Sequence, residues 1–296
     1  MFSGFTPKET YKLAQAIAAE PAPDITIVIS SIFFNLNSAE TNDEIQKLAR
    51  EISPLLTDYA NDILLDQELF QRISQVFEQR AQLSLSPEQT TLLEKTYKSF
   101  VRNGAQLGES DAATLRKLDQ ELAQLSLQFG EHVLAETNKF VHFVDQMSEL
   151  EGLPQGALEA AAQLAAEKGQ EGQWAFTLDY PSYIPVMTYA QSRDLRKTLF
   201  MAFNTKCAKG DALDNQEIVR QLVTLKQQRA KLLGYESHAH FTLEERMAKS
   251  PETVFEFLNS LLEKAKPKAA LDVQEVAELA KKLDQLEVLE KWDFAY

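Results

Sequence analysis

Residues Trp174–Lys206 read WAFTLDYPSYIPVMTYAQSRDLRKTLFMAFNTK, and they interrupt a sequence whose patterns are otherwise helical. At the start of this stretch, the large apolar residues Trp174, Phe176 and Leu178 alternate with smaller or polar ones. A period of two is typical of a half-buried strand. Pro181 and Pro185 then predict a turn or a sheet edge before a helix begins near Tyr189. A small strand element in a helical protein suggests a ligand-facing position.

The rest of the chain predicts helices. Apolar residues recur at three- and four-residue steps, most clearly at Leu115, Leu118, Leu122, Leu125 and Phe129. The predicted helices are 41–61, 66–80, 87–103, 111–138, 155–168, 189–206, 214–233, 237–247, 251–265 and 268–289. We therefore expect an all-α protein, a large multi-helix lobe with one small β element at about 174–186. We expect two regions, 1–150 and 151–296, the second with the β element.

Several helix ends are marked by capping residues. Thr41, Ser86 and Asp214 each stand three residues before Glu or Gln, which predicts a capping box at each start. Ser250 precedes a proline, the residue tolerated at the first helical position. Gly234 follows a long apolar pattern and suits a left-handed C-terminal cap.

Composition restricts the classes of function. The 296 residues carry 30 basic and 44 acidic side chains, a net charge of −14, which disfavours nucleic acid and anionic membranes as partners. The single cysteine, Cys207, excludes an internal disulfide and suits a reducing compartment. The sequence has neither an apolar run of about 18 residues nor an export-type start, so we expect a cytoplasmic protein.

The chain resembles the thimet-oligopeptidase family of zinc metallopeptidases, in its oligopeptidase A and bacterial peptidyl-dipeptidase branches. The segments that carry the resemblance occur in family order from about residue 30 to the C-terminus. They are Phe33–Asn42 (FFNLNSAETN), Gly152–Pro154, Trp174–Tyr189, Arg193–Arg196 (RDLR), Asp214–Asn215, Leu232–Tyr235 (LLGY) and Arg246–Pro251 (RMAKSP). Residues 1 to about 28 do not match the longer helical start of relatives.

The family's catalytic motif is missing from this sequence. Family members carry H-E-x-x-H on a helix, where two histidines at i and i+4 bind zinc and the glutamate activates a water. The four histidines here are His132, His142, His238 and His240, and none begins that motif. The family places it beyond the segment that matches Trp292–Tyr296. The resemblance therefore implies the N-terminal lobe of such a peptidase, without catalytic or metal-binding residues and leading toward an absent catalytic domain.

Other residues allow two interpretations each. His238 and His240 diverge by about 200° on a helix, so a polar helix start is favoured over a metal site. Cys207 is interpreted as packing rather than as a nucleophile. The cluster Lys264, Lys266 and Lys268 is interpreted as a solvated face rather than a basic patch.

Tyr183 and the arginines of the RDLR segment are the candidate binding residues. Tyr183 is the candidate substrate-binding residue, as a side chain that lines a substrate channel, and packing at the sheet edge is the alternative. Arg193 and Arg196, three apart on a helix, suit a carboxylate. An internal salt-bridge network with Asp194 and Asp179 is the favoured alternative.

The function that the resemblance implies is zinc-dependent hydrolysis of short peptides, with this chain as one wall of the substrate channel. Zinc belongs to the full-length family, and we expect no cofactor in this chain and no activity from it alone. The amphipathic pattern over Glu275–Glu290 needs a partner, either the absent catalytic domain or, by self-association, another copy. The alternatives are a non-enzymatic helical peptide-binding or scaffold protein, and a metal-dependent hydrolase that uses the four histidines.

Overall fold

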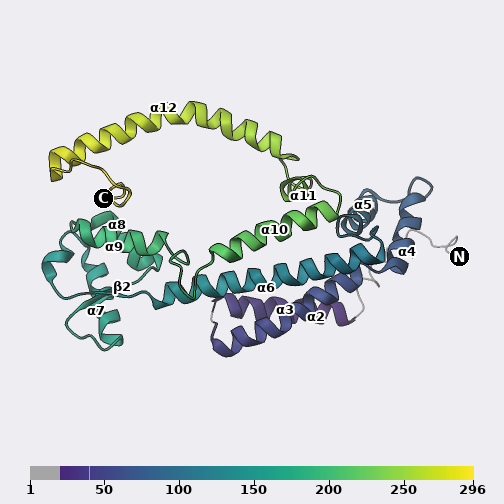
Figure 1. The fold of residues 1–296 in the computed structure, drawn as a ribbon, viewed down its shortest axis with the longest axis horizontal. Helices are drawn as coiled ribbons and strands as arrows, with labels where there is room; N and C mark the ends of the chain where they lie inside the picture. The colour runs from purple at the N-terminus through teal and green to yellow at the C-terminus, as the bar shows by residue number, and fades with distance from the viewer. Residues whose placement is uncertain (1–20, 40) are drawn as a thin grey trace. The chain divides into compact units, whose positions relative to one another are not determined.

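A computed structural model describes residues 21–39 and 41–296 (Figure 1). The order of elements is α2 (Pro21–Ala39), α3 (Asp43–Leu64), α4 (Gln67–Glu78), α5 (Pro87–Arg102), α6 (Glu109–Lys139), β1 (His142–Val144), η1 (Met147–Leu150), α7 (Gln155–Glu167), β2 (Trp174–Phe176), α8 (Tyr180–Tyr189), α9 (Arg193–Asn204), α10 (Gln216–Leu232), α11 (His238–Leu243), α12 (Pro251–Asp284) and η2 (Lys291–Asp293). The prediction of an all-α protein with one small β element is confirmed. No helix in the described part of the chain has the length and apolarity needed to cross a membrane.

The chain forms two compact units. Of the described residues, unit 1 comprises 21–39, 41–127 and 221–241, and unit 2 comprises 128–220 and 242–296. The chain passes from one unit to the other within α6, within α10 and at residue 241. The predicted regions 1–150 and 151–296 follow other boundaries, and as independent domains they stay a prediction.

Unit 1 is held together by aromatic packing and by ion pairs between helices. Phe70, Phe100 and Ala105 form its core cluster, where α4 packs on α5. Asp62 of α3 accepts a bond from the Arg116 guanidinium of α6 at 2.7 Å. One turn along, Asp58 accepts from the amide of Gln120 at 2.5 Å. These bonds fix α3 beside the first part of α6, as Figure 1 shows.

Unit 2 has the larger core, built around a two-stranded antiparallel sheet. Strand β1 pairs with β2, with Phe143 opposite Ala175. Ala175 and Phe176 are both buried, because α7 packs over β2 and covers the side that simple alternation would leave to water. The core cluster consists of Val144, Leu150, Leu153, Leu158, Ala161, Phe176, Tyr183, Val186, Met187, Ala190, Leu195 and Leu199.

Gly152 is required by the backbone of unit 2. Its φ of +89° lies in the left-handed region, where a side chain is strained. A Cβ atom there would overlap the carbonyl oxygen of Tyr189. The neighbouring Glu151 carbonyl accepts the N–H of Gln191 at 2.9 Å, so the segment before α7 lies against the junction of α8 and α9.

The predicted β element is shorter than expected. The strand ends at Phe176, and residues Tyr180–Tyr189 form helix α8 instead of a sheet edge. Pro181 lies in the first turn of α8, where its missing N–H costs no helical bond. The Ser182 hydroxyl accepts the Thr177 N–H at 3.0 Å and so fixes the turn between strand and helix.

The structure confirms some of the predicted helix caps and corrects one. The Ser86 capping box, the Ser250 cap and the left-handed Gly234 are confirmed. At the start of α3 the cap is Asn42, one residue after the predicted Thr41, because its side chain accepts the Ile45 N–H.

Three further segments of the structure differ from the prediction. Residues 251–284 form one helix through Pro267, where two helices were predicted, since the exposed backbone at the proline can bond to water. Helix α2 and strand β1 were not predicted. Residues 1–20, the greater part of the divergent start, lie outside the described residues.

Candidate functional site

Tyr183 is buried in the core of unit 2. It lies on α8 with 8% of its surface exposed, and its ring stacks on Phe203 at 4.4 Å between centroids and an interplanar angle of 21°. Burial raises the pKa of the Tyr183 phenol, although a side-chain hydrogen bond with Asn204 opposes this in part. The neighbouring Tyr180 is exposed and meets Phe203 edge-on. The contact of Tyr183 with a substrate stays a prediction.

The two arginines of the RDLR segment converge on one internal carboxylate, that of Asp293. Arg193 donates from Nε and Nη2 to the two carboxylate oxygens, with distances of 2.8–3.2 Å. Arg196 donates from Nη2 to Oδ1 at 3.0 Å. The internal network is thus observed, but its acid is Asp293, about a hundred residues away in sequence, rather than Asp194 or Asp179.

Arg196 has no donor group directed to solvent. Its side chain is 2% exposed, and it also donates to the carbonyls of Ala190 at 2.6 Å, Gln191 at 3.2 Å and Trp292 at 3.1 Å. A guanidinium with five N–H groups is therefore used by the fold itself. The Arg196 site accordingly holds the chain's own carboxylate instead of a substrate's.

The pKa of Asp293 reflects two opposing effects. Burial raises the pKa, but hydrogen bonds from Arg193, from the Glu290 N–H and from Arg196 outweigh burial, so the net shift is downward. Charged donors hold a carboxylate in its ionised form even when it is buried. Asp293 is therefore an anion at neutral pH that links helix α9 to the end of the chain.

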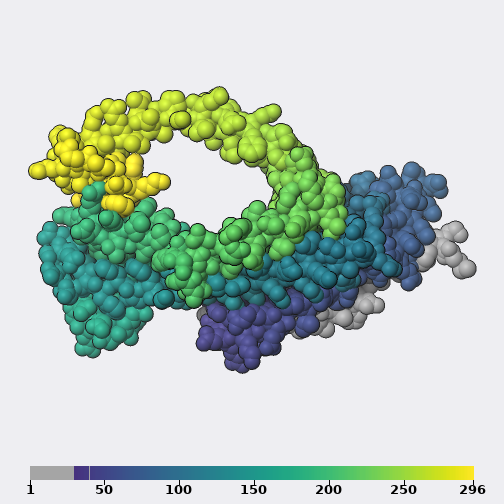
Figure 2. Space-filling view, in the orientation of Figure 1, coloured from purple at the N-terminus to yellow at the C-terminus, as the bar shows by residue number. Residues whose placement is uncertain are grey.

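Aromatic residues complete this junction. We call residues 285–296 the C-terminal turn. Trp292 meets Phe200 of α9 at 5.9 Å, and the Arg196 guanidinium lies 4.0 Å from the centre of the Tyr296 ring. Figure 2 shows the C-terminal residues, in yellow, resting on the surface of unit 2. The RDLR and WDFAY segments, which both resemble the family, are thus in direct contact.

The histidines do not form a zinc site. Nδ1 of His240 lies 2.8 Å from the Ser237 hydroxyl, and the ring of His238 stacks on Phe241. Burial lowers the pKa of His238, and the nearby charges of Lys226 and Arg229 lower it further. Among the described residues, no group of three or more His, Cys, Asp or Glu side chains is arranged to hold a metal ion. The residues present do not fit the zinc that the family resemblance implies.

The remaining candidates have ordinary surroundings. Cys207 is buried in a loop at a φ of 55°, and burial raises the pKa of its thiol, which disfavours the thiolate. Lys268 pairs with Asp272 one helical turn away on exposed α12, as a solvated face would.

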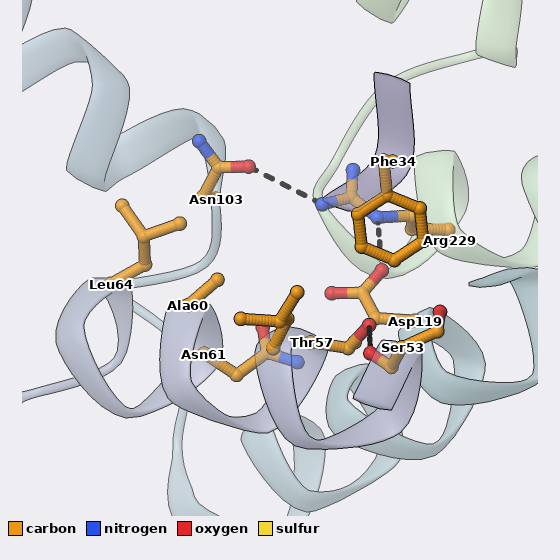
Figure 3. Close-up of a pocket in the computed structure, with 10 residues that line it drawn as sticks. Phe34, Ser53, Thr57, Ala60, Asn61, Leu64, Asn103, Asp119 and Arg229 are labelled. Atoms are coloured by element: carbon orange, nitrogen blue, oxygen red, sulfur yellow. Dashed lines mark hydrogen bonds and ion pairs between the residues drawn. The ribbon is translucent and has the colours of Figure 1, made fainter. Parts of the chain in front are cut away.

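Unit 1 contains a pocket that the sequence patterns did not indicate (Figure 3). Its volume is about 400 Å³, and its lining comes from α2, α3, the end of α5, α6 and α10. Residues from 34 to 229 contribute, so no local motif marks it. Its lining residues are Phe34, Ser53, Leu56, Thr57, Ala60, Asn61, Leu64, Asn103, Asp119 and Arg229.

Comparison with known proteins shows that this chain is similar to peptidases. Residues 186–296 match the family described as Peptidase family M3. The chain is 32% identical over 280 residues to the dipeptidyl carboxypeptidase of Escherichia coli (strain K12), an alignment of 95% of this chain and 41% of that protein. It is 30% identical over 266 residues to oligopeptidase A of Haemophilus influenzae, covering 88% of this chain and 39% of that protein.

A fungal relative extends the comparison. Saccharolysin of Saccharomyces cerevisiae is 28% identical over 265 residues, 87% of this chain and 36% of that protein. The chain thus spans about two fifths of the length of these relatives. The resemblance to this peptidase family that the sequence predicted is confirmed.

Proposed function

We propose that this chain is the N-terminal lobe of a cytoplasmic zinc-dependent oligopeptidase or peptidyl-dipeptidase, and that it forms one wall of the channel that receives short peptides. In this proposal the chain alone does not hydrolyse peptides. The H-E-x-x-H motif and the bound zinc come from polypeptide outside these 296 residues, and zinc supplies the Lewis acid and the activated water of the reaction.

One observation carries the proposal. Nearly the whole chain aligns with M3 relatives more than twice its length, yet it contains no H-E-x-x-H. A segment that keeps the family sequence without the motif fits a wall that positions substrate and restricts access. Tyr183 remains the candidate for contact with substrate, and its neighbour Tyr180 on α8 presents an exposed phenol.

Helix α12 has an exposed apolar face that fits a contact with a partner in this proposal. None of its 34 residues is buried. Phe255, Leu258 and Leu262 lie at i, i+3 and i+7 and are 64%, 49% and 57% exposed, so they share an apolar face. Contiguous exposed apolar surface marks an interaction site. We propose that this face packs against the catalytic domain, and that without it the chain self-associates.

Peptide turnover tests the proposal. The purified 296-residue chain is incubated with a quenched fluorescent oligopeptide, with and without a metal chelator, and the coding sequence downstream of Tyr296 is read for H-E-x-x-H. We expect no turnover by this chain, and chelator-sensitive turnover by a polypeptide extended through that motif.

Two results would contradict the proposal. Chelator-sensitive cleavage by the homogeneous 296-residue chain would show that its own residues hold the metal. A coding sequence that lacks the motif would favour the alternative of a non-enzymatic peptide-binding or scaffold protein. Sedimentation of the chain, with Leu258→Glu as the variant, tests self-association, which the substitution should reduce.

A further inference from the structure

Several side chains that line the pocket of unit 1 are apolar. Leu56, Ala60 and Leu64 come from successive turns of α3. Phe34 of α2 lies at the other end of the pocket, beside Arg229 and Asp119 (Figure 3). Binding sites for small ligands are concave, mostly apolar and fitted with a few polar groups that set orientation, at volumes of about 300–1,000 Å³. The pocket has these features at the small end of the range.

The charged side chains of the pocket are paired with each other. Arg229 donates from Nε to Asp119 Oδ1 at 2.6 Å and from Nη2 to Asn103 Oδ1 at 3.3 Å. Both members of the ion pair are about 15% exposed, which strengthens their mutual attraction. A charged ligand would have to compete with this pair, so the pocket suits an uncharged one.

One polar group in the pocket lacks its partner. The Nδ2 atom of Asn61 is buried and has no hydrogen-bond acceptor, and the residue as a whole is 5% exposed. A buried donor without a partner costs about 1–3 kcal/mol. Two other side-chain donors of the lining are engaged, since Thr57 donates to the Ser53 carbonyl at 3.0 Å and Asn103 Nδ2 to the Ser99 carbonyl at 2.8 Å. The group that Asn61 lacks is a hydrogen-bond acceptor, such as the carbonyl oxygen of a ligand.

We propose that this pocket binds a short, uncharged, apolar peptide segment whose main-chain carbonyl accepts a hydrogen bond from Asn61 Nδ2. Its apolar side chain lies against Leu56, Ala60 and Leu64. The choice of a peptide carbonyl among uncharged acceptors rests on the proposed function, whereas the preference for an uncharged acceptor rests on the Arg229–Asp119 pair and on Asn61.

Calorimetric titration of the 296-residue chain tests the site. The probe is N-acetyl-leucyl-alanine amide, which has both ends blocked, and the comparison probe is leucyl-alanine with free charged termini. We expect the blocked probe to bind at least about 10-fold more tightly, because the charged termini must be desolvated beside an ion pair that is already complete. Equal affinity of the two probes, or no binding of the blocked probe at millimolar concentration, would overturn the proposal.

Variants separate the donor from the shape of the pocket. Asn61→Leu keeps the branched shape of the side chain and removes an unpaired donor, so it should fold at least as stably as wild type and bind the blocked probe at least about 10-fold more weakly. Ala60→Phe, at an exposed position, should abolish binding by filling the pocket. Asn259→Leu on exposed α12 is the matched control and should bind as wild type. Wild-type affinity in Asn61→Leu, or in Ala60→Phe, would contradict the proposed site.

The result is independent of catalysis. Binding is measured on the chain alone with a probe that is not turned over. If an extended polypeptide shows no peptidase activity while Asn61-dependent binding persists, the proposed function fails and the pocket stands. If activity is present and the blocked probe does not bind, the pocket fails and the proposed function stands.

Discussion

Helix α12 and the C-terminal turn follow one another in unit 2, and they are held in opposite ways. Helix α12 has 34 residues and buries none of them, whereas the C-terminal turn has 12 residues and places Asp293 at 5% exposure between two arginines. The helix depends on local features, such as its Ser250 cap. The turn depends on residues of α9 that are distant in sequence. Local sequence can thus form a long element, but only tertiary contacts fix the end of the chain in one place.

The largest expected effect comes from breaking the buried pair. Arg196→Met leaves the Asp293 carboxylate buried with fewer donors, so we expect a loss of about 3–5 kcal/mol in the free energy of unfolding, measured in urea. The matched control is Arg220→Met, whose ion pair with Glu217 is exposed and should cost at most about 1 kcal/mol. If the two variants lost similar amounts of unfolding free energy, the buried ion pair would not be more stabilising than the exposed one.

A matched pair of leucines compares the two regions directly. Leu199 on α9 is 0% exposed, and Leu261 on α12 is 52% exposed. We expect Leu199→Ala to cost about 3 kcal/mol, because a cavity forms in the core, and Leu261→Ala to change stability by at most about 0.5 kcal/mol. The same urea titrations measure both. A large loss in Leu261→Ala would mean that this face of α12 is already covered, for example in a self-associated form.

Acid should weaken the C-terminal turn through Asp293. Its pKa is lower in the folded chain than in the unfolded chain, so the folded state binds fewer protons, and the stabilisation is present above about pH 4. It is lost as the pH falls through the lower, folded-state pKa. We expect Asp293→Asn to be less stable than wild type at pH 7 and to lose less on acidification to pH 3, measured by thermal unfolding. Asp284→Asn, at an exposed position, should follow the wild-type pH dependence.

The smallest expected effect is at the start of α12. Ser250→Ala removes the side chain that accepts the Thr253 N–H at 3.3 Å, which should cost the first turn about 1 kcal/mol. Amide hydrogen exchange over residues 251–256 should speed up. Exposed Ser260, within the same helix, is the control, and Ser260→Ala should leave exchange in that turn unchanged.

The same contrast between local and distant interactions separates what the sequence could predict from what it could not. The Ser86 box and the Gly234 cap were predictable because a few neighbouring residues decide them. The alternation at Trp174–Leu178 correctly indicated a strand, but the following segment formed a helix because Pro181 falls where a helix tolerates proline.

The candidate sites were harder to predict. Two arginines one helical turn apart predicted that a carboxylate binds to them. The sequence did not indicate that this carboxylate is Asp293, because only the fold brings position 293 to α9. No sequence motif indicates the pocket of unit 1, because its lining residues lie on five separate segments of the chain. Asn61, in particular, looks like an ordinary polar residue near a helix end until its burial is known.

Gly152 has a consequence for how distant homologues of this chain are aligned. Because a methyl group there would collide with the Tyr189 carbonyl oxygen, random mutagenesis followed by selection for a folded product should return glycine at 152 even while the flanking loop diversifies. The position can then serve as a fixed reference point for alignment where overall identity has fallen too far to be informative.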